Sequence, residues 1–158
     1  IRVTIARKSS SHQVQQSVID YLQNELTSGF QYANRYKQWN KLVDDTIRKF
    51  SSEVLHLKKQ CAKIACIAAS AKGTTLLNSC NIGTEIIDYI CDDTPEKVGK
   101  YSPGTGIPIK NTQELIKNPP DYLIILSENF KDALTERARS IGYKGKFIVG
   151  LPKWEIWN

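Results

Sequence analysis

The sequence predicts an α/β protein, because short apolar segments alternate with amphipathic segments through its second half. The apolar segments, which we interpret as strands, cover residues 63–69, 86–91, 107–109, 122–126 and 146–149. The helices expected between them cover residues 74–80, 112–117 and 129–141. Strands and helices in this alternation favour a parallel sheet with helices on its faces. The fold class expected for residues 61–158 is therefore a Rossmann-like α/β core.

The first part of the chain predicts a helical arm. Residues 1–5 alternate in polarity like a short strand, and residues 14–26 carry apolar side chains at helical spacing before Gly29. Over residues 34–60, one apolar stripe recurs at steps of three and four: Trp39, Val43, Ile47, Phe50, Val54 and Leu57. Since the stripe is only about three heptads long, we favour packing on this domain or a neighbouring one over a coiled coil. We expect residues 1–60 to pack on the core as part of one structural domain.

Composition sets the class of protein. The chain has 158 residues, of which 41% are hydrophobic and 24% charged, as in a globular domain rather than a disordered one. No apolar run approaches the roughly 20 residues that a bilayer crossing needs, and no signal peptide is visible, so a cytoplasmic location is expected. Because the sequence starts at Ile1 and contains no Met, we interpret it as a piece of a longer protein.

Charge and cysteine content argue against two other classes. Residues 1–60 hold ten Lys or Arg against five Asp or Glu, but no basic run exceeds two residues and no nucleic-acid reader motif is present. A solvated helix face is the preferred interpretation. The four cysteines lack a C-x-x-C pair and the two histidines add no ligand-like spacing, so no metal site is expected. Cys66 and Cys91 lie in apolar segments and are expected to be buried, reduced thiols.

The loop after the first predicted strand carries the clearest ligand signal. A dinucleotide-binding domain places three glycines there, whereas residues 68–74 contain only Gly73. Lys72, beside the start of a helix, nevertheless suits a phosphate. Asp92 ends the next strand about 20 residues further on, where an acid could bind a ribose; a turn-forming role for Asp92 and simple exposure of Lys72 stay open. Residues 99–108, with three glycines and two prolines, form a shaped loop of the kind that grips ligands.

These residues occur in an order that resembles a known family. The segment Ala69-Ser70-Ala71-Lys72-Gly73-Thr74-Thr75-Leu76-Leu77-Asn78 is similar to a motif in the C-terminal domain of S-adenosylmethionine-dependent sugar C-methyltransferases. Further matches follow in order at residues 87–93, 99–108, 120–122 and 145–149, together with Asn129. The resemblance covers essentially the whole chain.

The resemblance implies a substrate-positioning role for this domain in an enzyme acting on nucleotide-linked deoxysugars. In that family a central methyltransferase domain binds S-adenosylmethionine and carries a Tyr-His-Glu-His segment with the acid/base residues; this chain has no such segment. No catalytic residue and no cofactor are therefore assigned here, and the nucleotide-linked sugar and the central domain are the expected partners. The implied substrate-binding residues are Ala69, Ser70, Ala71, Lys72, Gly73, Thr74, Asn78, Asp92, Lys100, Tyr101, Pro103, Gly104, Thr105 and Asn129.

Two positions depart from the family pattern. Ala68 stands where the family usually has glycine, and Glu128 stands where a tryptophan usually precedes Asn129. Glu128 in place of an indole removes a stacking surface and adds negative charge near the implied diphosphate site.

Other functions remain as alternatives. The runner-up is a free-standing nucleotide- or sugar-nucleotide-binding module of polysaccharide biosynthesis. An NAD-dependent oxidoreductase is disfavoured by the missing glycines, and a nucleic-acid module is least favoured. A homo-oligomer is possible through the stripe on residues 39–57 or through Trp154 and Trp157, although packing of these two indoles on the sheet is preferred.

Overall fold

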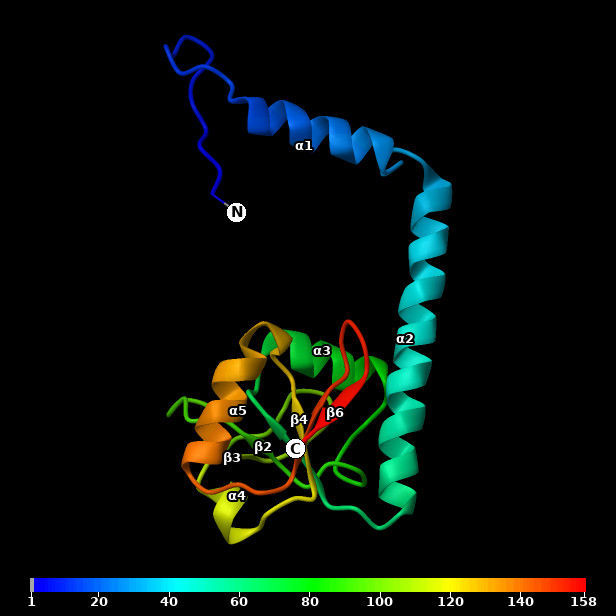
Figure 1. The fold of residues 1–158 in the computed structure, drawn as a ribbon, viewed down its shortest axis with the longest axis vertical. Coiled ribbons are helices and arrows are strands. Elements are labelled where there is room, and N and C mark those ends of the chain that lie inside the picture. Colours follow the sequence, from blue (N-terminus) through cyan, green and yellow to red (C-terminus); the bar gives the residue numbers. More distant parts are fainter. Residues whose placement is uncertain (1) are drawn as a thin grey trace. The chain divides into compact units, whose positions relative to one another are not determined.

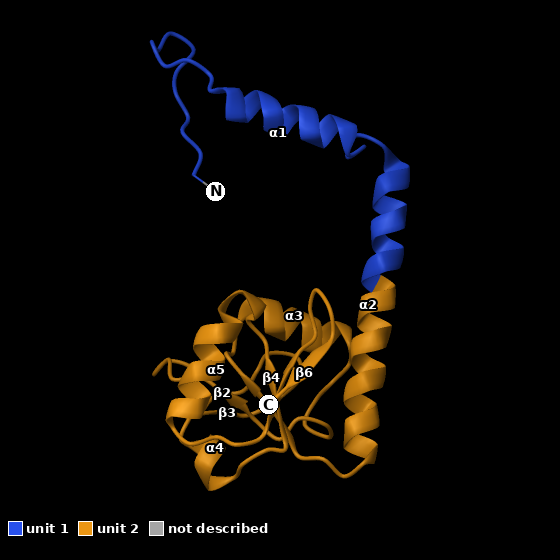
Figure 2. Ribbon diagram, viewed as in Figure 1, with its two compact units in different colours: residues 1–43 blue, residues 44–158 orange. Residues whose placement is uncertain are grey.

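The computed structural model describes residues 2–158 and divides the chain into two compact units (Figure 2). The first covers residues 1–43 and the second residues 44–158. Helix α2 (Ala33–Lys59) contributes residues to both units. None of the helices in residues 2–158 combines the length and apolar character that a bilayer crossing requires.

Within residues 44–158 the strands form a six-stranded sheet in the order β3-β2-β1-β4-β5-β6. Figure 1 shows the sheet with helices around it. The strands are β1 (Ile64–Ile67), β2 (Ile90–Cys91), β3 (Ile109–Lys110), β4 (Tyr122–Ile125), β5 (Lys146–Val149) and β6 (Glu155–Trp157). Strands β1 to β5 pair in parallel, and β6 pairs antiparallel with β5. The Rossmann-like α/β core expected from the sequence is confirmed.

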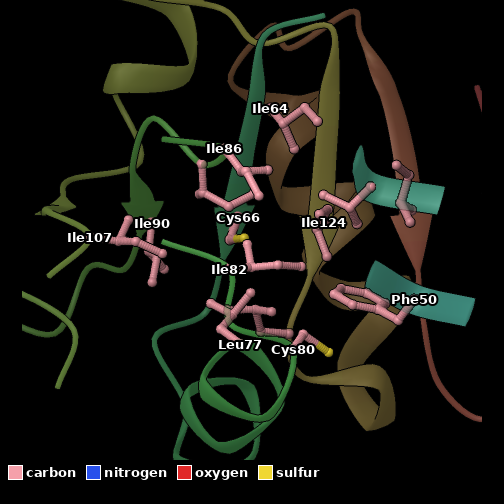
Figure 3. Packing of buried hydrophobic residues seen from close by; sticks show 14 of the residues in the cluster. Phe50, Ile64, Cys66, Leu77, Cys80, Ile82, Ile86, Ile90, Ile107 and Ile124 are labelled. Atoms are coloured by element: carbon pink, nitrogen blue, oxygen red, sulfur yellow. The ribbon is translucent and has the colours of Figure 1, made fainter. Parts of the chain in front are cut away.

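Alternation along the strands gives the sheet two buried faces. Ile64 and Cys66 of β1 pack with Phe50 of α2 and Leu77 of α3 (Ala71–Ser79), as Figure 3 shows. The intervening Ala65 and Ile67 belong to a second cluster. That cluster includes Leu115 of α4 (Glu114–Lys117) and Ala138 of α5 (Lys131–Ser140). Since side chains on a strand alternate between faces, helices cover both sides, as expected for parallel strands.

The C-terminus packs onto this core, as preferred from the sequence. Trp157 of β6 stacks on Phe147 of β5 with ring centroids 5.7 Å apart. Trp154 packs edge-on against Phe50, also at 5.7 Å. Gly150 makes room for this arrangement, because a Cβ there would lie 2.2 Å from the Phe50 ring.

The cysteines behave as small apolar residues. Cys66, Cys80 and Cys91 are buried, as predicted for two of them, and Cys61 is exposed. Burial is the main reason that the pKa of Cys91 rises to about 12 and that of Cys66 higher still. The buried thiols are therefore protonated and chemically quiet.

Residues 2–43 contain α1 (Gln16–Thr27), the turn at residues 28–32 and the start of α2. Gly29, at φ +76°, ends α1 in a left-handed conformation that suits glycine. None of the residues 2–43 is buried. This part of the chain therefore has no hydrophobic core of its own among the described residues.

Three sequence predictions need correction. The strand expected at residues 1–5 does not form: residues 2–6 are exposed and have no partner strand, and Ile1 lies outside the described residues. The strand expected at residues 86–91 is reduced to Ile90–Cys91. Ile86 and Ile87 instead bond to Gly83 O in a turn, which an apolar run does not reveal. Strand β6 was missed, because its pattern is short and follows Pro152.

Candidate functional site

The candidate site lies where β1 and β4 end side by side. From β1 the chain proceeds to β2 and β3 on one side of the sheet, whereas β4 leads to β5 on the other. Open α/β sheets bind ligands at such a switch point, outside the carboxyl ends of the strands. Here the loop after β1 brings residues 68–74 to this edge, and the loop after β4 brings residues 126–130.

The β1–α3 loop is built for a tight turn onto the helix. Ala68 adopts φ +72°, a conformation that favours glycine. Ser70 caps α3 by accepting a hydrogen bond from the N–H of Gly73 at 3.1 Å, and its hydroxyl donates to the Leu126 carbonyl at 3.2 Å. Gly73 itself permits close packing, since a Cβ there would lie 2.5 Å from the Leu126 Cβ. Ser70 and Gly73 therefore hold α3 against β4.

Lys72 meets Glu128 across the switch point. Its ammonium lies 2.5 Å from a Glu128 carboxylate oxygen, in a pair whose lysine is 58% exposed. The hydrogen bond from Lys72 is the largest cause that lowers the pKa of Glu128. Ala68 and Glu128, the two positions that depart from the family pattern, therefore lie in the same region as Lys72. Ala68 forms the turn, and Glu128 pairs with the Lys72 ammonium.

The Asp92 carboxylate accepts hydrogen bonds from neighbouring loop residues. One of its oxygens accepts the Ala69 N–H at 2.8 Å and the Lys97 ammonium at 3.1 Å, and the other accepts the Thr94 N–H at 2.9 Å. Burial alone raises the pKa of Asp92, but these hydrogen bonds outweigh it and lower the pKa. Lys97 also donates to the Ala69 carbonyl at 3.0 Å. Lys97 was missed as a site residue, although its position five residues after Asp92, in the same loop, was a usable signal.

The loop at residues 99–108, hereafter the glycine-rich loop, contacts Asn78 of α3. The Asn78 amide donates to the carbonyls of Thr74 at 2.8 Å and Pro103 at 3.0 Å. A Cβ on Gly104, at φ +78°, would lie 2.0 Å from the Asn78 amide oxygen. Asn78, Pro103 and Gly104 are therefore brought together with the helix that carries Lys72.

The remaining predicted residues lie at varied distances from this centre. Ala71 is exposed at the first turn of α3, and Thr74 is half-buried. Tyr101 is exposed and bridges to Pro108 through the backbone, while Lys100 is exposed beside it. Thr105 is half-buried, and its hydroxyl has no hydrogen-bond partner in the structure. Asn129 is exposed in the short helix η1 (Glu128–Phe130), next to Glu128.

The site is an open surface rather than a closed pocket. The hollow between Lys72 and Glu128, which reaches Gly150, has a volume of about 40 Å³. Pockets that enclose a small molecule usually measure about 300–1,000 Å³. This edge can therefore offer one face to a ligand but cannot surround it. Among residues 2–158, no three His, Cys, Asp or Glu side chains gather closely enough to hold a metal.

Comparison with known proteins decides the family. The family model described as the C-methyltransferase C-terminal domain matches residues 1–152. The chain belongs to this family. A curated relative, the C-methyltransferase NovU of Streptomyces niveus, is 26% identical over 154 residues, which cover 97% of this chain and 37% of the relative. The chain thus spans little more than a third of the length of that relative.

Membership in the C-methyltransferase C-terminal domain family agrees with the extent of the sequence resemblance. The match includes the β1–α3 loop, the glycine-rich loop and the region around Glu128 in one continuous stretch. The match also includes residues 1–43, so the first unit belongs to the family domain and is no unrelated extension.

Proposed function

We propose that this domain positions a nucleotide-linked deoxysugar for methyl transfer by a C-methyltransferase. Its role is to hold the diphosphate of the substrate at the carboxyl edge of β1 and β4. Methyl donation belongs to a separate methyltransferase domain, which binds S-adenosylmethionine.

The observation that carries this proposal is the cation beside the amino end of α3. Ser70 caps the N–H of Gly73, while helix geometry leaves the N–H groups of Ala71 and Lys72 without partners inside the helix. These groups and the Lys72 ammonium together suit a phosphate. Because the Glu128 carboxylate already pairs with the Lys72 ammonium, a bound diphosphate would take the place of that carboxylate.

The fit of S-adenosylmethionine to this edge is poor, which supports assigning the methyl donor to another domain. Asp92, the acid placed to bind ribose hydroxyls, already accepts hydrogen bonds from Ala69, Thr94 and Lys97. The hollow of about 40 Å³ encloses no nucleobase, so a nucleotide held at this edge would lie open on one side. An open face of this kind is suited to a ligand that a second domain covers from the other side.

The first test is calorimetric titration with a thymidine-diphosphate sugar. Lys72→Ala is expected to raise the Kd roughly fivefold to tenfold, because one charge-assisted contact to phosphate is lost. Lys144→Ala is the control: Lys144 is exposed just before β5, at the opposite edge of the sheet, and its loss should change Kd less than about twofold. An unchanged Kd for Lys72→Ala would remove Lys72 from the substrate site.

A further inference from the structure

Residues 14–43 expose an apolar surface that the described chain does not cover. On α1 the exposed apolar side chains are Val18, Ile19, Tyr21, Leu22 and Leu26, and Val14 precedes the helix. Leu22 is 56% exposed and Trp39, on α2, is 55% exposed. Single exposed apolar residues are ordinary, but a contiguous face of them marks an interaction surface.

Helix α1 has little to stabilise it by itself. It has 12 residues, a length at which isolated helices are marginal in water. Its N-cap residue Gln15 makes no capping hydrogen bond through its side chain, and its end turns lack the charges that favour a helix. A helix with these properties normally depends on burial of its apolar face.

The apolar stripe of α2 changes environment along its length. Phe50, Val54 and Leu57 are buried, whereas Tyr36, Trp39 and Val43 are exposed. These residues lie at helical steps of three and four, so they share one face of the helix. The first half of the stripe therefore has the same chemistry as the packed half, but its side chains stay exposed.

The first turns of α2 and Phe30, in the turn before it, have the composition of a binding hot spot. Phe30, Arg35, Gln38, Trp39 and Leu42 line a hollow of about 260 Å³. The Arg35 guanidinium lies 5.8 Å from the centre of the Phe30 ring, and the rings of Phe30 and Tyr36 are 6.4 Å apart. Trp, Tyr and Arg are the residues most enriched at energetic centres of interfaces. The hollow is wide enough to admit one apolar side chain of a partner.

Charge leaves this face close to neutral. Residues 14–43 contain three Lys or Arg and two Asp or Glu. Binding to this face would therefore depend mainly on its apolar side chains.

We propose that residues 14–43, hereafter the docking arm, bind the methyl-donor domain of the same polypeptide. This inference rests on the proposed function, in which a donor domain works beside this one. The matched family is a C-terminal domain, and the NovU relative is much longer than the match.

Amide hydrogen exchange in the full-length gene product tests this proposal. We expect amides of residues 16–27 to exchange at least tenfold more slowly in the full-length protein than in residues 1–158 alone. The double variant Leu22→Asp/Trp39→Asp should abolish this protection. The control Gln23→Asp/Asn34→Asp adds the same charge on other faces of the two helices and should retain it.

Three results would overturn the proposal. The first is equal exchange of residues 16–27 in the two wild-type proteins, and the second is a gene that encodes no domain upstream of residue 1. The third is protection in residues 1–158 alone that falls on dilution, because it would identify a second copy as the occupant. Titration of the same variants with the thymidine-diphosphate sugar separates the two proposals, since the docking variant should keep the Kd of wild-type residues 1–158.

Discussion

The two halves of α2 carry one apolar stripe in two different environments. In residues 44–59, Phe50, Val54 and Leu57 belong to the core that covers one face of the sheet. In residues 33–43, Tyr36 and Trp39 are about half exposed. The difference shows that an amphipathic pattern fixes which side of a helix is apolar, while burial depends on what else the protein places beside it.

The largest expected effect separates these halves by stability. Phe50→Ala should lower the free energy of unfolding by about 3–5 kcal/mol, because it removes a buried ring that contacts Trp154. Trp39→Ala should change the stability of residues 1–158 by no more than about 0.5 kcal/mol, because Trp39 is exposed there. Urea unfolding of the two variants measures both values. Similar losses would mean that the exposed half of the stripe is already packed in solution.

A smaller effect is expected from a backbone difference between the units. Both have a turn with positive φ, but the docking arm has Gly29 at +76° and the β1–α3 loop has Ala68 at +72°. Ala68→Gly should stabilise residues 1–158 by about 0.5–1 kcal/mol, since the relief of a left-handed alanine exceeds the entropy that glycine adds to the unfolded chain. Ala71→Gly, at a helical position, should instead destabilise by up to about 1 kcal/mol. Thermal unfolding that places both variants below wild type would contradict the strain at Ala68.

The smallest effect concerns the ion pair at the site. Because Lys72 lowers the folded-state pKa of Glu128 below its ordinary value of 4.5, the pair stabilises the fold above that pH and ceases to do so as Glu128 is protonated. Glu128→Gln should therefore cost about 0.2–1 kcal/mol at pH 7, with the cost shrinking as pH falls to 3. Urea unfolding across this range would reveal it. A cost that grows on acidification would have the wrong sign for a lowered pKa.

Much of the core was predictable because its periodicity is strong. The strand at residues 146–149 agrees with β5 at both ends, and the long helix at 34–60 agrees with α2 to within one residue. The strand expected at residues 1–5 was wrong, since alternation alone cannot provide a neighbouring strand. Periodicity also could not predict that only half of the α2 stripe is buried, because burial depends on tertiary contacts.

The region of the candidate site follows from the sequence, whereas the contacts within it do not. The position of Lys72 at the start of a helix follows from the loop sequence, and the structure confirms it. Its pairing with Glu128 joins residues 56 positions apart, and this depends on β1 and β4 being neighbours in the sheet. For Asp92 the sequence allows two roles, ribose binding and turn formation. Its hydrogen bonds to Ala69 and Thr94 favour turn formation.

The most direct test of the diphosphate site is the Kd of a thymidine-diphosphate sugar for Glu128→Gln compared with wild type. Replacing the carboxylate with a neutral amide frees the Lys72 ammonium and removes a negative charge that competes with phosphate. We expect the variant to bind roughly threefold to tenfold more tightly, with the gain lost in the double variant Glu128→Gln/Lys72→Ala. An equal or weaker affinity for Glu128→Gln would contradict the assignment of the diphosphate to this edge of the sheet.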